Sequence, residues 1–116
     1  MFCEALAGAM GVEDDVEVVG VTALEAATLV AVRSRPDVVV MEVQRSVEEA
    51  GEAVAQLLAV PSGPGLVVLS ASRDGRLTSA VLDAGAGAFV SKDAALEDLL
   101  LAVRAVARGR RRPDGA

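Results

Sequence analysis

Four short apolar runs alternate with segments of helical periodicity, and this alternation constrains the fold more than any other feature. The clearest runs are DVVVME at 37–42 and LVVL at 66–69, and shorter ones stand at 17–21 and 88–90. Unbroken runs of this kind are typical of strands buried on both faces, as in parallel sheets. Strands that alternate with helices predict a parallel sheet with helices on both faces.

The segments between these runs carry helix signals. Two capping boxes, Ser46–Glu49 and Thr22–Glu25, open helices, and Asp93 and Gly109 are expected to cap and to stop the last one. Five helices are expected in all, over residues 2–10, 22–35, 46–58, 75–84 and 94–108. The predicted fold class is α/β, a three-layer, doubly wound parallel sheet of about four strands and five helices.

Composition limits the functions that are open to the chain. It has 116 residues, one cysteine and no histidine, tyrosine or tryptophan, which suits one domain without an internal disulfide or histidine chemistry. No apolar run approaches the ~20 residues that span a bilayer, and the first residues lack the basic flank of a secretory signal. We therefore expect a cytoplasmic protein that does not insert into membranes.

Charge is distributed unevenly along the chain. Residues 1–107 hold 7 lysines and arginines against 16 acidic residues, a net charge of −9. Residues 108–116 hold four arginines against Asp114, a net charge of +3. We expect a domain over 1–108 that does not bind nucleic acid by itself, followed by a basic flexible tail over 109–116.

Three polar residues stand at the ends of predicted strands. Glu42 and Ser70 close two of the runs, and Lys92 follows the last one. Sites in open parallel sheets form beyond the carboxyl ends of the strands, so these side chains should converge on one edge. A carboxylate, a hydroxyl and an ammonium together make a candidate anion-sensing cluster.

The chain resembles the receiver domain of bacterial response regulators, in the branch that usually carries a C-terminal helix-turn-helix. The resembling stretches, in family-like order and spacing, are VEVVG at 16–20, RPDVVVM at 35–41, VVLSA at 67–71, DAGAGAF at 83–89, SKDA at 91–94 and LLAVRAVARG at 100–109. The resemblance implies a flavodoxin-like receiver fold that lacks its first strand, with residues 1–108 as the receiver-like domain.

The resemblance also implies roles for single residues. Glu42 stands where the family has its phosphoacceptor aspartate, Ser70 and Lys92 match the residues that contact the phosphoryl group, and Phe89 matches the switch aromatic. No residue is assigned a catalytic role.

The departures from the family pattern concern the metal. The acidic pair that holds Mg²⁺ in the family ends the missing strand, and Glu42 alone is a poor start for an octahedral site. Asp14 and Asp15 precede a predicted strand, which places them at the opposite rim, so we reject them as substitutes. We expect no cofactor and no metal site.

Two interpretations of Glu42 stay open. Its carboxylate could be a permanent partial mimic of the phosphorylated state, or a strand-end group paired with Lys92 that no longer switches. Ser70 could equally serve only to cap local backbone. For Phe89, core packing is the default role.

The function that we predict is that of a degenerate receiver domain in two-component signal transduction. It would act through protein contacts, independently of phosphorylation and without enzymatic activity. A histidine kinase or another regulator is a candidate partner, and a homodimer is a further option. The expected contact surface is the last helix with the helix and strand before it, which charge substitutions at Leu100 and Val103 would test. The alternative is a truncated fragment of a complete DNA-binding transcriptional response regulator. A phosphate-using enzyme is disfavoured, because no P-loop or Gly-x-Gly-x-x-Gly pattern follows a strand.

Overall fold

A computed structural model of the chain describes residues 2–23, 26–43, 46–60 and 63–111. Within these residues, three parallel strands form one sheet in chain order: β1 (Val38–Glu42), β2 (Gly65–Ser70) and β3 (Ala88–Ser91). β2 is the central strand and is buried from Leu66 to Ser70, which accounts for its unbroken apolar sequence.

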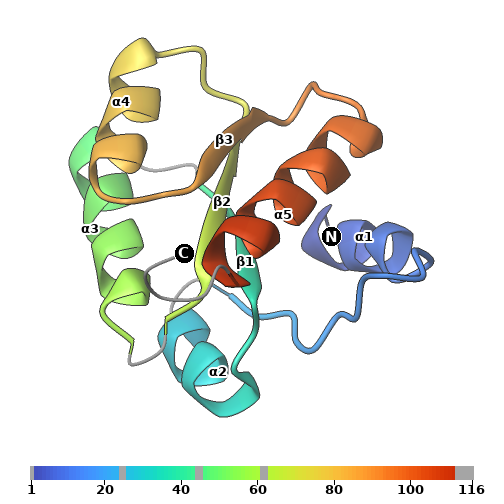
Figure 1. Cartoon of the computed structure of the whole chain (residues 1–116). Coiled ribbons are helices and arrows are strands. Elements are labelled where there is room, and N and C mark those ends of the chain that lie inside the picture. Colours follow the sequence, from blue (N-terminus) through green and yellow to red (C-terminus); the bar gives the residue numbers. More distant parts are fainter. Residues whose placement is uncertain (1, 24–25, 44–45, 61–62, 112–116) are drawn as a thin grey trace.

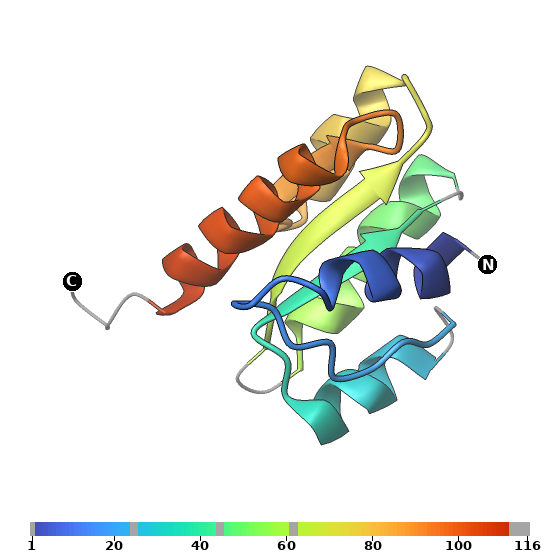
Figure 2. The same ribbon diagram turned by 90° about the vertical axis from the view of Figure 1, so that its right-hand side faces the viewer.

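Helices cover both faces of the sheet (Figures 1 and 2). The helices α2 (Ala27–Ser34), α3 (Val47–Leu58) and α4 (Gly75–Asp83) pack on one face, and α1 (Phe2–Met10) and α5 (Leu96–Arg111) on the other. The predicted three-layer α/β fold is therefore confirmed. None of the helices in the described ranges is long and apolar enough to cross a membrane.

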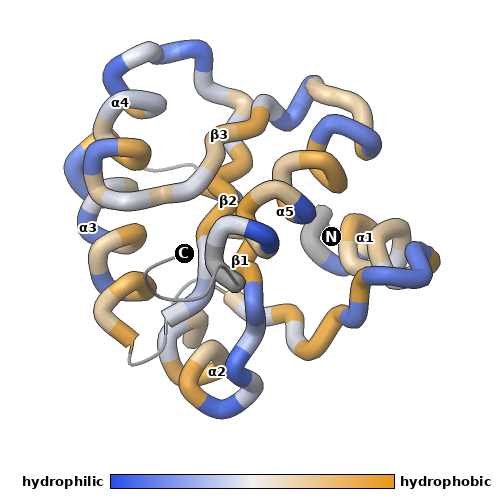
Figure 3. Tube along the Cα trace, viewed as in Figure 1, coloured by the Kyte–Doolittle hydropathy of each residue, from blue (hydrophilic) through white to orange (hydrophobic). Residues whose placement is uncertain are grey.

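Alternation along the strands divides the core into two clusters. Met41 and Val68 face α3 and α4, whereas Val40 and Val67 face α5. In Figure 3 the strands are coloured mostly as hydrophobic, in agreement with burial on both faces. The valine runs thus supply the apolar surface for both helical layers.

The predicted strand at 17–21 is wrong, so the described part of the chain has three strands and not about four. Residues 16–23 follow a path without ladder pairing, and Val18, Val19 and Val21 are 41%, 47% and 48% exposed. Gly20 passes close to α2, where an added Cβ would lie 3.1 Å from Val30 Cγ1. The valine pattern is typical of a strand, but a strand also requires a paired neighbour.

Arg104 of α5 holds the start of this segment. Its Nε and Nη2 atoms donate to both carboxylate oxygens of Asp15 at 2.7 and 2.9 Å, and Nη2 also donates to Glu13 at 3.1 Å. The hydrogen bonds from Arg104 lower the pKa of Asp15, and those to Asp15 and Glu13 raise the pKa of Arg104. The turn after α1 is thereby attached to the last helix.

The capping box at α3 is confirmed, since the Ser46 hydroxyl accepts from the Glu49 N–H and the Glu49 carboxylate accepts from the Ser46 N–H. The box proposed at Thr22–Glu25 extends outside the described residues. Helix α2 begins at Ala27, later than predicted, without a side-chain cap.

The limits predicted for α5 also need correction. The helix begins at Leu96 and continues to Arg111, past Gly109. The Asp93 carboxylate contacts Arg73 at 3.4 Å. Glycine lowers helix propensity by only about 1 kcal/mol, which flanking helical residues can offset.

Candidate functional site

The carboxyl edge of the sheet carries the predicted polar residues. Glu42 and Ser70 are the last residues of β1 and β2, and Lys92 follows the last residue of β3. Because β2 lies between β1 and β3, Ser70 stands between the other two. The structure brings all three to one edge of the sheet.

Backbone bonds continue past the strands and fix these positions. The Lys92 N–H donates to the Ser70 carbonyl at 2.9 Å, and the Val43 N–H donates to the Leu69 carbonyl at 2.9 Å. The three strand ends are thus held in register one residue beyond the ladder. This rigid base determines where the Glu42 and Lys92 side chains start.

Glu42 and Lys92 form a direct ion pair across the end of β2. Lys92 Nζ donates to Glu42 Oε2, and the two side chains are only 18% and 19% exposed. Two strand spacings, about 10 Å, separate the backbones, so both long side chains must lean over Ser70. The ammonium is already neutralised by a carboxylate in a partly dehydrated place, which favours a fixed contact over capture of a dissolved anion.

The Ser70 side chain forms a hydrogen bond within the loop that follows β2. The residue is 2% exposed, and its Oγ accepts from the Ser72 N–H at 3.1 Å. The Ser72 Oγ accepts in turn from the Asp74 N–H at 3.1 Å. Ser70 therefore has the local capping contact that was one of its two interpretations.

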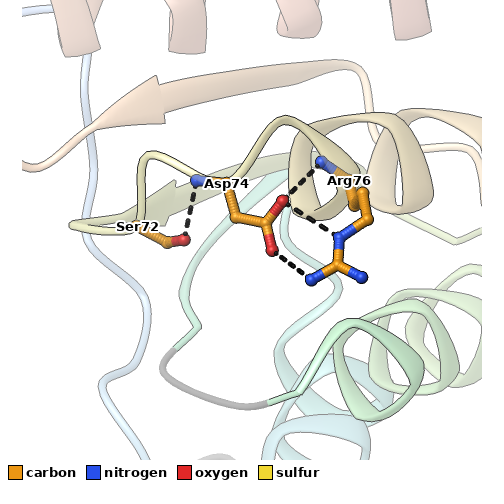
Figure 4. Close-up of polar contacts among 3 residues, drawn as sticks. All are labelled: Ser72, Asp74 and Arg76. Atoms are coloured by element: carbon orange, nitrogen blue, oxygen red, sulfur yellow. Dashed lines mark hydrogen bonds and ion pairs between the residues drawn. The ribbon is translucent and has the colours of Figure 1, made fainter.

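The same loop ends in an N-cap for α4 (Figure 4). Asp74 Oδ1 accepts from the Arg76 N–H at 2.9 Å, and the Arg76 guanidinium donates to both carboxylate oxygens at 3.3 and 3.0 Å. These bonds lower the pKa of Asp74 and raise that of Arg76. The sequence contained a signal for this cap, an aspartate directly before the helix, which our sequence analysis missed.

Phe89 packs on the sheet face that carries α3 and α4. Its side chain is partly buried against the core cluster that contains Val68 and Leu77. Core packing, its default role, is what the structure shows. A rotamer switch at Phe89 stays a prediction.

The proposed contact surface on α5 requires a correction. Leu100 is 5% exposed, and Val103 packs against the same buried cluster on the sheet. Charges at these positions would disrupt the core and not test a surface. The most exposed leucine of α5 among the described residues is Leu101, at 62%, and Leu96 at the start of the helix is 38% exposed.

The donor set at this edge does not fit Mg²⁺ by itself. Mg²⁺ prefers several oxygen ligands in octahedral geometry, and the carboxylate of Glu42 is bound to Lys92. Asp15 is bound to Arg104. Among the residues that the structure describes, no group of three or more acidic, cysteine or histidine side chains could hold a metal ion.

Solved structures share this fold. A LuxR-family DNA-binding response regulator from Staphylococcus aureus superimposes with a TM-score of 0.80 at 15% identity, over 92% of this chain and 90% of its own. The signal receiver domain of NarL, a response regulator of Mycobacterium tuberculosis, superimposes with a TM-score of 0.78 at 23% identity, over 91% of this chain and 86% of its own. A response regulator from Thermotoga maritima has a TM-score of 0.73 at 24% identity, over 90% of this chain and 87% of its own.

No protein-family model and no curated protein sequence matches the chain. The chain has the flavodoxin-like fold of response regulator receiver domains.

Proposed function

We propose that the chain is a degenerate receiver domain that works in two-component signal transduction through protein contacts and without phosphorylation. The observation that supports it is the Glu42–Lys92 ion pair. A receiver needs its lysine to bind the incoming phosphoryl group, whereas here the lysine already binds a carboxylate of the chain itself. The ion pair joins the ends of β1 and β3 across β2.

Acetyl phosphate with Mg²⁺ tests this directly. We expect the intact mass of the protein to stay unchanged after incubation, because phosphoryl transfer depends on metal-assisted neutralisation of charge. The matched variant is Glu42→Asp, which places the shorter aspartate side chain at the acceptor position. A phosphoryl adduct in this variant alone would show that the residue at position 42 is the only obstacle to phosphoryl transfer. A phosphoryl adduct on the unchanged protein that disappears in Glu42→Gln would falsify the proposal.

The proposed contact surface is the outer side of α5 around Leu101. If the domain signals as a homodimer, or binds a kinase or second regulator there, Leu101→Glu should weaken that association. Leu29→Glu on α2 is the matched control, since Leu29 is 51% exposed on the opposite layer. Equal effects of both variants in sedimentation equilibrium or pull-down would contradict the assignment.

A second candidate function is the receiver part of a longer DNA-binding transcriptional regulator. The four arginines from Arg108 to Arg112 favour it, because they would bring a cationic end of α5 toward DNA. The S. aureus protein with this fold is a DNA-binding regulator. Intact mass of the natural product distinguishes the two: a product well above 11.8 kDa supports the second candidate. In either case we propose a cytoplasmic location.

A further inference from the structure

A groove of about 870 Å³ runs along the outer edge of β1. All five residues of β1 line it, from Val38 to Glu42. The irregular segment at 16–23 also lines it, and helix α2 adds Ala27 and Val30. Figure 2 shows this segment and α1 passing on the side of β1 away from β2.

The backbone of β1 presents hydrogen-bonding groups to this groove. The Asp37 carbonyl accepts from the Gly65 N–H, and the Val43 N–H donates to the Leu69 carbonyl, so residues 37 and 43 point toward β2. Because N–H and C=O direction alternates along a strand, residues 39 and 41 also point toward β2. Val38 and Val40 therefore direct their N–H and C=O groups into the groove.

No strand of the described chain pairs with this edge, since β1 is an end of the sheet. Edge strands usually carry charged residues, proline or bulges that prevent pairing. Val38, Val39, Val40 and Met41 have none of these. The edge is suited to accept another strand.

The charges around the groove select the occupant. Of its six charged lining residues, Asp14, Asp15, Glu17, Asp37 and Glu42 are acidic and Arg35 is basic. Asp15 is bound to Arg104 and Glu42 to Lys92, so the exposed Asp14 and Glu17 are the carboxylates on which selectivity rests. A second copy of this chain, with a net charge of −6, is disfavoured as the occupant of this acidic groove. An apolar strand with lysine or arginine at its ends would be attracted.

We propose that the outer edge of β1 binds an extended apolar segment of a partner protein, flanked by basic residues, as an additional parallel strand. The backbone groups of Val38 and Val40 supply main-chain affinity, and the acidic rim supplies selectivity. The groove ends at Glu42, but its strand-pairing groups at Val38 and Val40 are separate from the Glu42–Lys92 pair in the proposed function.

The probe is a capped fluorescent peptide, Arg-Arg-Val-Ile-Val-Leu-Val-Arg-Arg, in an anisotropy titration. We expect saturable binding that weakens as salt is added. The control peptide has proline in place of the central valine. It keeps the charge but cannot pair fully, and we expect it to bind about tenfold more weakly. Equal binding of both peptides, or no saturable binding, overturns the proposal.

Two variants locate the site. Val40→Pro removes an N–H that points into the groove, which an edge strand tolerates, and should weaken peptide binding about tenfold. Because Val40 also packs against α5, the exposed pair Asp14→Lys and Glu17→Lys is a second variant that leaves the core untouched. It should weaken binding of the arginine peptide without lowering the melting temperature. Unchanged affinity in the double variant overturns the proposal.

Amide exchange by NMR identifies the occupant. The Val38 and Val40 amides should exchange quickly in the free monomer and slowly with peptide, while those of Val39 and Met41 stay unchanged. Slow exchange of Val38 and Val40 in the free monomer would mean that residues 17–21 cover the edge. If the Val38 and Val40 amides are protected only in a dimer, a second copy of the chain covers the edge. Either result overturns the partner-strand assignment.

Discussion

At the scale of single residues, the ion pair between Glu42 and Lys92 differs from the surface pairs of the same chain. Its side chains are about four-fifths buried, whereas those of Arg73 and Asp93 are 90% and 71% exposed. Removal of one partner of a buried pair leaves the other charge poorly solvated, while exposed pairs contribute little.

Lys92→Met should therefore lower the free energy of unfolding by about 1–3 kcal/mol. Arg73→Met is the matched control and should change it by less than about 0.5 kcal/mol. Urea denaturation followed by circular dichroism measures both. Equal effects would show that the Glu42–Lys92 pair behaves as an ordinary surface contact.

The contact of Asp15 with Arg104 has a defined pH dependence. Hydrogen bonds from Arg104 lower the pKa of Asp15 below its ordinary value near 3.8. The contribution of this contact to stability is thus complete above that value and is lost as the pH falls through the lowered pKa.

NMR titration of the Asp15 carboxyl carbon should show this lowered pKa, together with release of the 11–23 amides at the same acidic midpoint. In Arg104→Gln the pKa of Asp15 should return toward its ordinary value. An unchanged midpoint in the variant would disprove the role of Arg104.

At the scale of elements, α5 lies close against the amino-terminal ends of β2 and β3. A Cβ at Gly87 would lie 3.0 Å from Val106 Cγ2, and one at Gly65 would lie 2.4 Å from Val106 Cγ1. Two glycines thus create the space for one valine of the helix. This explains why β2 begins with Gly65 and β3 follows directly after Gly87.

Gly87→Ala should destabilise the protein by about 1–3 kcal/mol, because the packed helix cannot move away without loss of contacts. Adding Val106→Ala should cost less than the sum of the two single changes. Gly51→Ala is the matched control, since nothing lies within 4 Å of its added Cβ, and it should stabilise α3 by about 0.5–1 kcal/mol. Thermal unfolding of the four variants checks the set.

The sequence was informative about elements wherever local chemistry decides the structure. The capping box at Ser46 and the apolar runs of β1, β2 and β3 were predicted, as was the meeting of Glu42, Ser70 and Lys92 at one edge, since topology alone places strand ends there. The segment at 17–21 was mispredicted, because pairing depends on a neighbour that no local pattern reveals. The Glu42–Lys92 ion pair and the hydrogen bonds from Arg104 to Asp15 and Glu13 also could not be predicted, because they depend on tertiary packing.

At the scale of the whole molecule, stability should be uneven. Residues 2–23 lack ladder bonds and are attached to the domain mainly by Arg104 and by the packing of Leu6 and Met10. Segments with few buried contacts open at a lower free energy than the core.

Native-state hydrogen exchange should therefore show fast exchange over residues 11–23. It should show slow exchange over β2, because this strand is buried and pairs with a neighbouring strand on each side. The control is α3, which has the capping box and should exchange slowly. Protection of residues 17–21 equal to that of β2 would contradict this and would indicate a strand pairing in solution.

The strand order has a consequence for biosynthesis. Because β1, β2 and β3 lie side by side in chain order, each new strand emerging from the ribosome can add to the same growing edge. The face lined by Val40, Val67 and Val90 is covered largely by α5, which is made after all three strands. Until that helix is released, the nascent domain exposes an apolar surface. Products that end before residue 96 should therefore depend on chaperones or aggregate.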